Sequence, residues 1–404
     1  MSSPKVLISD DYLGEVWKRL RYFLETEYTS DLISKVHVGR AHPKDPNVRK
    51  QAQQLAHSIR QAEEYFHAAG GVTLATRPTL LYYGAVSITR ATVLMFSEGT
   101  YSYDYLRSHA RHQHHGLVLS RQITSCDTNK LSPQEFLSRL ECSVNVRSGL
   151  PWGHFPVFYD ACPSSLYHHT LQIIRKGDST GLSRHESNPG IDKTPLERIA
   201  TRPLNVLALV KGLPDLYRSL LDLDVEPDLC RGLFHCTMTT NPQPPADGAP
   251  RPDIASYHYD FAMGGLTVER KASLRDFLKA QTPEIEVAAD LGGNLALKLG
   301  FDVERGTDFE PRYLPDLVED FHGEKFYVLS PQEYVLEAPA YLAILFCLGM
   351  LSRYYPDVWI RLIDTNIRTA ELLDTLLTAA SNKLPILILD QLTDTKHVPR
   401  LAWD

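Results

Sequence analysis

The chain has 404 residues, of which 43% are hydrophobic and 23% are charged, and its formal net charge is −7. This length is too great for one small core and predicts two or three domains or subdomains. The negative charge argues against a chain-wide surface for polyanions but leaves room for a local basic patch. The six cysteines show no CxxC or metal-type spacing, so we expect reduced thiols in a cytoplasmic protein.

Helices are expected in the first part of the chain. They cover residues 9–29, 47–69, 78–96 and about 101–113, with a polar connection over 31–45. The helix over 78–96 is apolar on most sides, so we expect it to lie in a core, with Arg90 as its one charged residue. A membrane span needs roughly 20 apolar residues. Because Arg90 interrupts this run, we expect no membrane segment and no membrane partner.

The middle of the chain changes to short β-branched runs that are typical of strands. Strands are expected near 117–119, 142–147, 231–240, 257–263, 284–289, 295–303 and 325–329, the last five in one antiparallel sheet. Helices are expected from Ser132, over 164–175 and over 203–221, and 176–192 reads as a loop. The last part of the chain is helical again, over 339–354, 366–382 and 384–392.

These elements predict an α+β fold. We expect a helical N-terminal module (1–116), a mixed central region with an antiparallel sheet (117–330), and a helical C-terminal region (331–404). The C-terminal helices would close the structure by packing back on the first module.

The candidate chemistry lies between residues 101 and 117, where four histidines and two arginines stand beside a glycine. Arg107 and His112 have an Arg-x4-His spacing, and His114 falls within the same wider window. After a buried helix, this spacing resembles the signature of the HEPN superfamily of helical ribonucleases and nucleotide-binding domains. The hypothesis makes Arg107, His112 and His114 catalytic. Its substrate-binding residues are Arg90, Arg111 and His115. The alternative for Arg90 is a structural salt bridge with a carboxylate such as Glu98 or Asp104.

The residue types fit metal-independent RNA cleavage. That reaction needs a base to take the 2′-hydroxyl proton and a cation to stabilise the phosphate charge, and histidine and arginine suit these roles. On a straight helix, however, residues five apart lie about 140° apart around the axis, so Arg107 and His112 would not share a face. They could meet only at a bend, at the helix end near Gly116, or across a dimer. The alternative is a solvated basic helix end without chemistry.

Other kinds of site receive less support from the sequence. The histidines, including His109, could instead capture Zn²⁺ or Ni²⁺, but no cysteine or well-spaced His–Glu partner is nearby, so we expect no metal. No cofactor is expected, because GxGxxG, Walker and GxSxG patterns are absent and Gly292-Gly293 reads as a β-turn. Tyr101, Tyr103 and Tyr105 could stack on bases, although tyrosines at helical spacing are more often packing residues.

Several stretches, in the same order along the chain, resemble the YaaC-like family of bacterial proteins. They are Arg-Pro-Thr-Leu-Leu-Tyr-Tyr-Gly at 77–84, His-Gly-Leu at 115–117, Val-Asn-Val-Arg-Ser-Gly-Leu at 144–150, Leu-Ser-Arg-Tyr-Tyr-Pro-Asp-Val-Trp at 351–359 and Leu-Pro-Ile-Leu-Ile-Leu-Asp at 384–390. The resemblance implies a soluble, bacterial-type protein and implies no particular reaction.

Whether the protein is an enzyme is left open by its sequence. The first hypothesis is a YaaC-like protein directed at RNA or a nucleotide, with a HEPN-like ribonuclease site. The second is a non-catalytic component that holds a protein partner, or a second copy of itself, in a stress or phage-defence assembly. That biological setting rests on analogy alone. A third hypothesis is a small-molecule pocket beneath the β-rich region.

Overall fold

Two compact units make up the chain. The computed structural model describes residues 5–38, 42–96, 101–120, 131–163, 168–176, 179–188, 194–240, 254–281, 285–302, 317–329 and 334–400. The sheet unit comprises Met1–Lys5, Ser165–Asp192 and Asp228–Pro331, and the helical unit comprises Val6–Ser164, Lys193–Pro227 and Gln332–Asp404. Residues 117–330 contribute to both units, so the units do not follow the three consecutive stretches that the sequence suggests.

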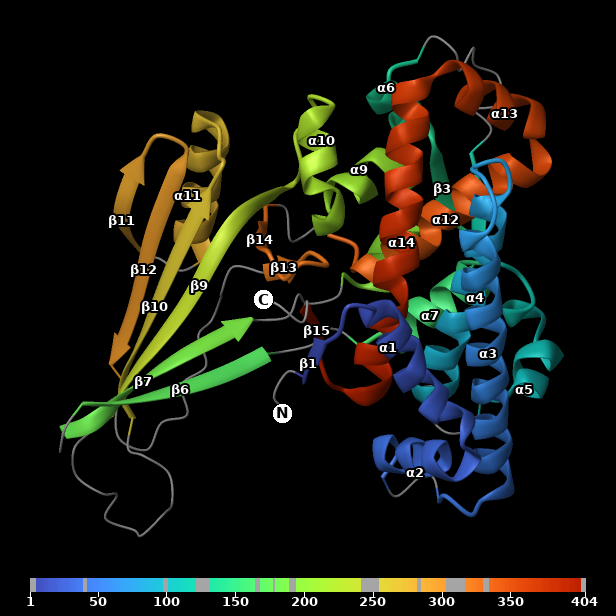
Figure 1. The fold of residues 1–404 in the computed structure, drawn as a ribbon, viewed down its shortest axis with the longest axis horizontal. Coiled ribbons are helices and arrows are strands. Elements are labelled where there is room, and N and C mark those ends of the chain that lie inside the picture. The colour runs from blue at the N-terminus through green and yellow to red at the C-terminus, as the bar shows by residue number, and fades with distance from the viewer. Residues whose placement is uncertain are drawn as a thin grey trace. The chain divides into compact units, whose positions relative to one another are not determined.

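The helical unit is built around helix α4 (Arg77–Phe96) (Figure 1). Its other helices are α1 (Tyr12–Leu20), α2 (Thr26–Val36), α3 (Pro46–Gly70), α5 (Tyr103–Ser108), α6 (Pro133–Arg139), α7 (His154–Ala161), α8 (Leu196–Ala200), α9 (Val206–Lys211), α10 (Tyr217–Asp222), α12 (Glu337–Tyr354), α13 (Pro356–Thr365) and α14 (Ile367–Thr393). Short 3₁₀ helices are η1 (Arg21–Leu24), η2 (Ala110–His112) and η5 (Pro214–Leu216).

Small groups of paired strands accompany these helices. Strand β2 (Leu117–Leu119) pairs with β3 (Glu141–Val144), which pairs with β8 (Leu204–Asn205), and β4 (Val146–Arg147) pairs with β5 (Leu150–Pro151). Strand β1 (Lys5–Ile8) pairs with β15 (His397–Arg400). The strands expected near 117–119 and 142–147 are therefore confirmed, the second as two short strands.

Helix α4 lies in the core of this unit, as its apolar sequence predicts. It packs against α3, α7, α12 and α14. At Gly84 the neighbouring helix comes so close that a Cβ atom would lie 2.9 Å from the ring of Phe66. By length and composition, α4 and α14 could each cross a membrane. However, 72% of the most apolar stretch of α4 and 61% of that of α14 are buried inside the protein. That burial is the ordinary property of a core helix.

Several helix boundaries differ from the sequence-based expectation. The single helix expected over 9–29 is interrupted at Glu25, where the backbone is extended, and the chain then continues as α2 into the expected connection. The segments 366–382 and 384–392 form one helix, α14, with Pro385 inside it. Proline removes one helical hydrogen bond. Leu384, Pro385 and Ile386 are all buried, and this packing keeps the helix continuous.

Helix α6 begins with a reciprocal cap. The Ser132 hydroxyl accepts from the amide of Glu135 at 3.2 Å, and the Glu135 carboxylate accepts from the amide of Ser132 at 2.8 Å. We expect Ser132→Ala to lower the free energy of unfolding by about 1 kcal/mol, as measured by urea denaturation. Ser138→Ala is the matched control, because the Ser138 hydroxyl only donates to the Glu135 carbonyl. Equal losses in the two variants would contradict a capping role.

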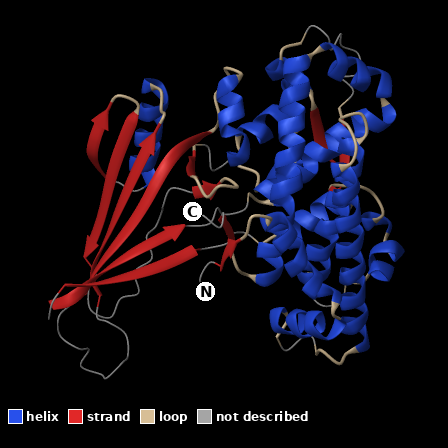
Figure 2. Cartoon of the chain, viewed as in Figure 1, coloured by secondary structure: helices blue, strands red, loops and turns tan. Residues whose placement is uncertain are grey.

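The sheet unit contains one antiparallel sheet, drawn as red arrows in Figure 2. Its main strand order is β11-β12-β10-β9-β14-β13, and β6 joins through β7, which pairs with β9. The strands are β6 (His168–Lys176), β7 (Ser179–Asn188), β9 (Leu229–Thr240), β10 (Ile254–Gly264), β11 (Glu286–Leu291), β12 (Asn294–Asp302), β13 (Leu317–Glu319) and β14 (Lys325–Val328). With helices in the N- and C-terminal parts, this sheet confirms the α+β class.

One face of the sheet is covered by helix α11 (Val268–Gln281). Leu274 and Leu278 of this helix are buried in one cluster with Phe261 and Met263 of β10 and Leu295 of β12. The residues of β10 on this face are two apart, as the alternation of side chains along a strand requires. The turn between β11 and β12 has a positive φ of 57° at Gly292, which confirms the β-turn reading of the Gly-Gly pair.

Strands β6 and β7 and helix α11 differ from what the sequence predicts. Residues 164–175 were expected to be helical and 176–192 to be a loop, but the described parts form the paired strands β6 and β7. The sequence reading also missed α11 altogether. Both elements depend on the sheet, since β7 pairs with β9 and α11 packs on the sheet face. Strand propensity follows such partners more than the local sequence.

Candidate functional site

The segment with the histidines bends instead of continuing as one helix. Helix α5 starts at a cap, in which the Ser102 hydroxyl accepts from the amide of Tyr105 at 3.2 Å, and it ends at Ser108. His109 then has an extended backbone, with φ −106° and ψ 112°, before the 3₁₀ turn η2. The helix expected over 101–113 is therefore two short pieces. The bend removes the geometric objection to a common site for Arg107 and His112.

A close approach of two backbones fixes this segment against the start of α7. Gly116 and Gly153 have positive φ angles of 90° and 106°, and a Cβ on Gly153 would lie 2.3 Å from the Gly116 Cα. The amide of Gly153 donates to the Arg111 carbonyl at 2.6 Å, and that of His154 donates to the His114 carbonyl at 2.8 Å. Only glycines allow this approach without strain, so the pair positions the histidines.

The bend brings five of the six candidate residues to the wall of one cavity of about 250 Å³. The arginine and histidine side chains that line it are Arg90, Arg107, His112, His114, His115 and His154. The remaining wall is Val86, Tyr103, Leu106, Gln113 and Val157, so no aspartate or glutamate lines the cavity among the described residues. This lining gives the cavity a positive character.

Arg111 does not line the cavity. Its Nε donates to the carbonyl of Pro151 at 2.9 Å, which ties the loop to the β4–β5 hairpin. The sequence reading proposed that it binds substrate, whereas its described contact is structural.

The two arginines of the cavity share an aromatic neighbour. The guanidinium carbons of Arg90 and Arg107 lie 6.0 Å and 5.5 Å from the centre of the Tyr103 ring, within cation–π range. The amide of Tyr103 donates to Gln54 of α3 at 2.5 Å, and its hydroxyl is hydrogen-bonded to Ser58. Tyr103 is thus anchored from both ends and supports both cations.

Arg90 has no ion pair within the part of the chain that the structure describes. Asp104, one carboxylate considered from the sequence, pairs with Lys50 instead, and Glu98, the other, lies outside the described residues. Arg90 is half-buried in a helix most of whose residues are buried. Its guanidinium therefore meets the cavity without a neutralising partner.

The histidines of the cavity differ in their surroundings. Burial and the charges of Arg111 and His109 lower the pKa of His112, whose Nδ1 is buried without a hydrogen-bond partner. Burial and nearby cations also lower the pKa of His115, whose Nδ1 is hydrogen-bonded to the hydroxyl of Tyr82 at 2.8 Å. Such imidazoles are neutral near pH 7, as a general base must be.

His154 was missed by the sequence reading. It lies 39 residues beyond His115 along the chain, and no spacing rule joins them. Its backbone amide binds the His114 carbonyl and its Nε2 lies 2.8 Å from the hydroxyl of Thr89 on α4. The only local signal is a histidine that directly follows a turn glycine, Gly153, at a helix start.

The comparison with known proteins decides the family. A family model described as YaaC-like Protein matches residues 21–392 of the chain. The chain belongs to the YaaC-like family. No curated protein and no solved structure matches it.

Within this YaaC-like chain, the described residues contain no group of three or more His, Cys, Asp or Glu side chains placed to hold a metal ion. Cys142, Cys162, Cys230 and Cys347 are buried free thiols.

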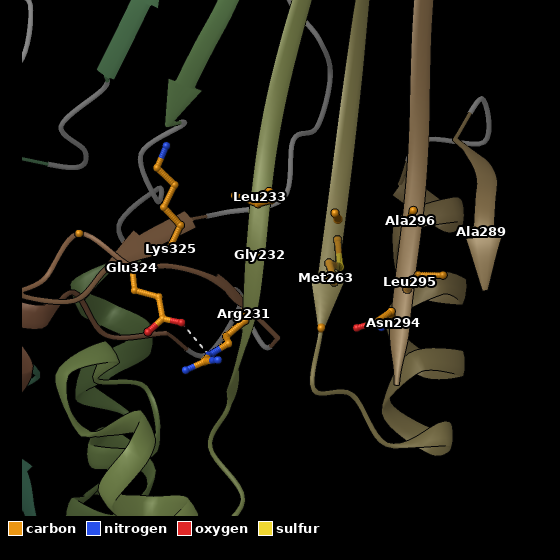
Figure 3. A pocket seen from close by; sticks show the side chains of 13 residues that line it. Arg231, Gly232, Leu233, Met263, Ala289, Asn294, Leu295, Ala296, Glu324 and Lys325 are labelled. Carbon is orange, nitrogen blue, oxygen red and sulfur yellow. Dashed lines mark ion pairs between the residues drawn. The ribbon is translucent and has the colours of Figure 1, made fainter. Parts of the chain in front are cut away.

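A second cavity, of about 640 Å³, lies in the sheet unit of this YaaC-like protein (Figure 3). Much of its wall is small or apolar, from Gly232, Leu233, Ala262, Met263, Ala289, Leu295 and Ala296. Arg231 is neutralised by Glu324 at 2.6 Å, and Lys325, the other cation of this wall, has no ion pair among the described residues. The cavity suits a largely apolar small molecule, which remains a prediction, and is less suited to phosphate than the first.

We expect the stability of this YaaC-like protein to fall as the pH drops from 7 to 5. Burial first, then Arg90 and His115, hold the pKa of His154 well below its ordinary 6.5. Below pH 6.5 the unfolded chain therefore takes up a proton that the folded chain does not. The contribution of His154 to the free energy of unfolding is fully present above that pH and declines below it. The slope approaches about 1.4 kcal/mol per pH unit for one such histidine.

Urea denaturation at several pH values measures this slope. His154→Gln removes one of the titrating groups and should make the slope shallower, with the lowered pKa values of His112 and His115 accounting for part of what is left, whereas His57→Gln, at an exposed position on α3, should not change it. A wild-type curve that does not change between pH 7 and 5 would contradict the assignment.

Proposed function

We propose that this YaaC-like protein binds the phosphate of RNA or of a nucleotide in the cavity lined by Arg90 and Arg107. The observation that carries the proposal is Arg90, a half-buried cation on a core helix with no ion pair among the described residues. A desolvated charge without a partner is costly. A bound anion would offset that cost, so the cavity is better explained as occupied during function than as permanently empty.

The chemistry of the wall favours phosphate among anions. Guanidinium groups match phosphate oxygens with paired donors, and two of them line this cavity without a competing carboxylate. The volume of about 250 Å³ is below the roughly 300 Å³ at which pockets for drug-sized ligands begin. It therefore suits a phosphate with its adjoining sugar better than a whole nucleotide.

The same arrangement supports a HEPN-like, metal-independent ribonuclease. In that reaction the ribose 2′-oxygen attacks the phosphorus and its proton passes to a neutral imidazole. The bond from phosphorus to the 5′-oxygen breaks, and the departing oxygen takes a proton from an imidazolium or from water. The products are a 2′,3′-cyclic phosphate and a 5′-hydroxyl. Arg90 and Arg107 would stabilise the charge on the phosphate oxygens, and His112 is the base nominated by the sequence.

Binding and cleavage of a fluorescein-labelled RNA oligonucleotide in the presence of EDTA test the proposal. Arg107→Ala combined with His112→Ala should weaken binding and abolish the cyclic phosphate product. The matched control is Arg60→Ala combined with His57→Ala, which removes the same residue types from exposed positions on α3. RNA binding that is equal in both double variants would overturn the phosphate site. Binding without cleavage would retain the site and remove the ribonuclease.

The remaining expectations belong to this proposal as predictions. They are a cytoplasmic location, a homodimer or protein partner, and a role in stress or phage defence. Mass spectrometry of what co-purifies with the protein separates them, since nucleic acid or a nucleotide supports the first hypothesis. A stoichiometric protein partner without nucleic acid would favour the interaction component.

A further inference from the structure

The hydroxyl of Thr89 fixes the proton on the ring of His154. Its Oγ1 lies 2.6 Å from the Ala85 carbonyl oxygen, one turn back in α4, and 2.8 Å from Nε2 of His154. Two oxygens at such a separation need a proton between them, and threonine has only one hydroxyl proton. The hydroxyl therefore donates to the carbonyl and accepts from His154, so Nε2 carries the ring proton.

The other ring nitrogen is then an acceptor. In a neutral imidazole with its proton on Nε2, Nδ1 holds a lone pair. No described residue is hydrogen-bonded to this Nδ1, and His154 lines the cavity. Burial and the neighbouring cations lower the pKa of His154, which supports the neutral form. The cavity thus contains an acceptor at His154 beside the donors of Arg90 and Arg107.

A phosphodiester by itself does not complement both the arginine donors and the Nδ1 acceptor of His154. Its oxygens accept hydrogen bonds from the arginines, but it has no proton to give to His154. In RNA, the ribose 2′-hydroxyl stands beside the phosphate and can donate. A deoxyribose would leave the buried acceptor unpaired, which costs free energy.

We infer that, in the bound state before any transfer of its proton to a base, the ribose 2′-hydroxyl beside the bound phosphate donates a hydrogen bond to Nδ1 of His154, which so selects ribose phosphates over deoxyribose phosphates. This inference rests on the proposed phosphate site and names its substrate class. Thr89 is a positioning residue in this arrangement, since it sets the tautomer of His154 and does not face the ligand.

The test uses one six-nucleotide sequence made as RNA, as 2′-fluoro RNA and as DNA, each with a 5′-fluorescein. Dissociation constants are measured by fluorescence anisotropy at 4 °C with EDTA, and gels verify that the probes are intact. Wild-type protein should bind RNA about tenfold more tightly than the other two probes, the effect of one buried hydrogen bond. The 2′-fluoro probe keeps the size of the substituent and removes its proton.

Two variants separate recognition from folding. His154→Leu removes both ring nitrogens while the Thr89 hydroxyl still donates to the Ala85 carbonyl, so its preference for RNA should fall to within about twofold. Thr89→Val leaves His154 in place but frees its tautomer, and should reduce the preference in part. The test needs only one of the two variants to show the same urea denaturation curve as the wild-type protein.

The outcomes distinguish the two proposals. If all three probes bind equally, and Arg90→Met weakens them all, the phosphate site stands and the recognition by His154 is overturned. An RNA preference that persists unchanged in His154→Leu also overturns it. If no probe binds, the phosphate site fails and the inference fails with it.

Discussion

Arg90→Met is expected to weaken the binding of a phosphate-bearing RNA probe by about 30-fold or more and to leave the protein equally or more stable. The loss corresponds to about 2 kcal/mol, the usual contribution of hydrogen bonds to a charged group. The stability should not fall, because methionine replaces an unpaired cation on a core helix with an apolar side chain of similar length. Anisotropy titration and urea denaturation measure the two effects.

Arg77→Met provides the opposite case on the same helix. Arg77 is paired with Asp374 at 2.8 Å and also donates to Thr378. Its loss should lower the free energy of unfolding by up to about 1 kcal/mol, the range for partly exposed pairs, and leave RNA affinity unchanged. If Arg90→Met destabilises the fold as Arg77→Met does and binds RNA normally, Arg90 is a structural residue and the proposed site is wrong.

Gly153→Ala is expected to destabilise the helical unit by about 3 kcal/mol. The added Cβ would lie 2.3 Å from both the Cα and the nitrogen of Gly116, and the φ of Gly153 is 106°. Backbone atoms on both sides must move, and the segment that carries His112, His114 and His115 moves with them. RNA binding should therefore weaken in parallel with the thermal midpoint.

Gly149→Ala is the control for backbone strain alone. Gly149 also has a positive φ, 75°, but a Cβ there would meet nothing within 4 Å. It should cost about 1 kcal/mol and leave binding intact. Equal effects of the two substitutions would show that the contact between Gly116 and Gly153 does not position the site.

Much of the candidate site was predictable from local sequence. The Arg-x4-His spacing, the cluster of histidines and the charged residue in an apolar helix singled out five residues that line one cavity. Each of these signals is local, because it depends on residue type and on short separations along the chain. The same local periodicity located the core helix α4 and the main strands of the sheet.

The exceptions share a physical cause. His154 lies at the cavity because of the backbone contact between Gly116 and Gly153. Arg111 does not line the cavity, because its side chain donates to the Pro151 carbonyl. Strands β6 and β7 and helix α11 were misread or missed because the sheet, a tertiary partner, stabilises them.

The sequence by itself determined the α+β class, the family resemblance and the types of residue available for chemistry, because composition, periodicity and short motifs are local properties. Only the tertiary structure decided that Arg107 and His112 face one cavity, through the extended backbone at His109. It also decided which histidine has a fixed tautomer. That assignment depends on a hydroxyl 65 residues away, and no local pattern encodes a contact of such separation.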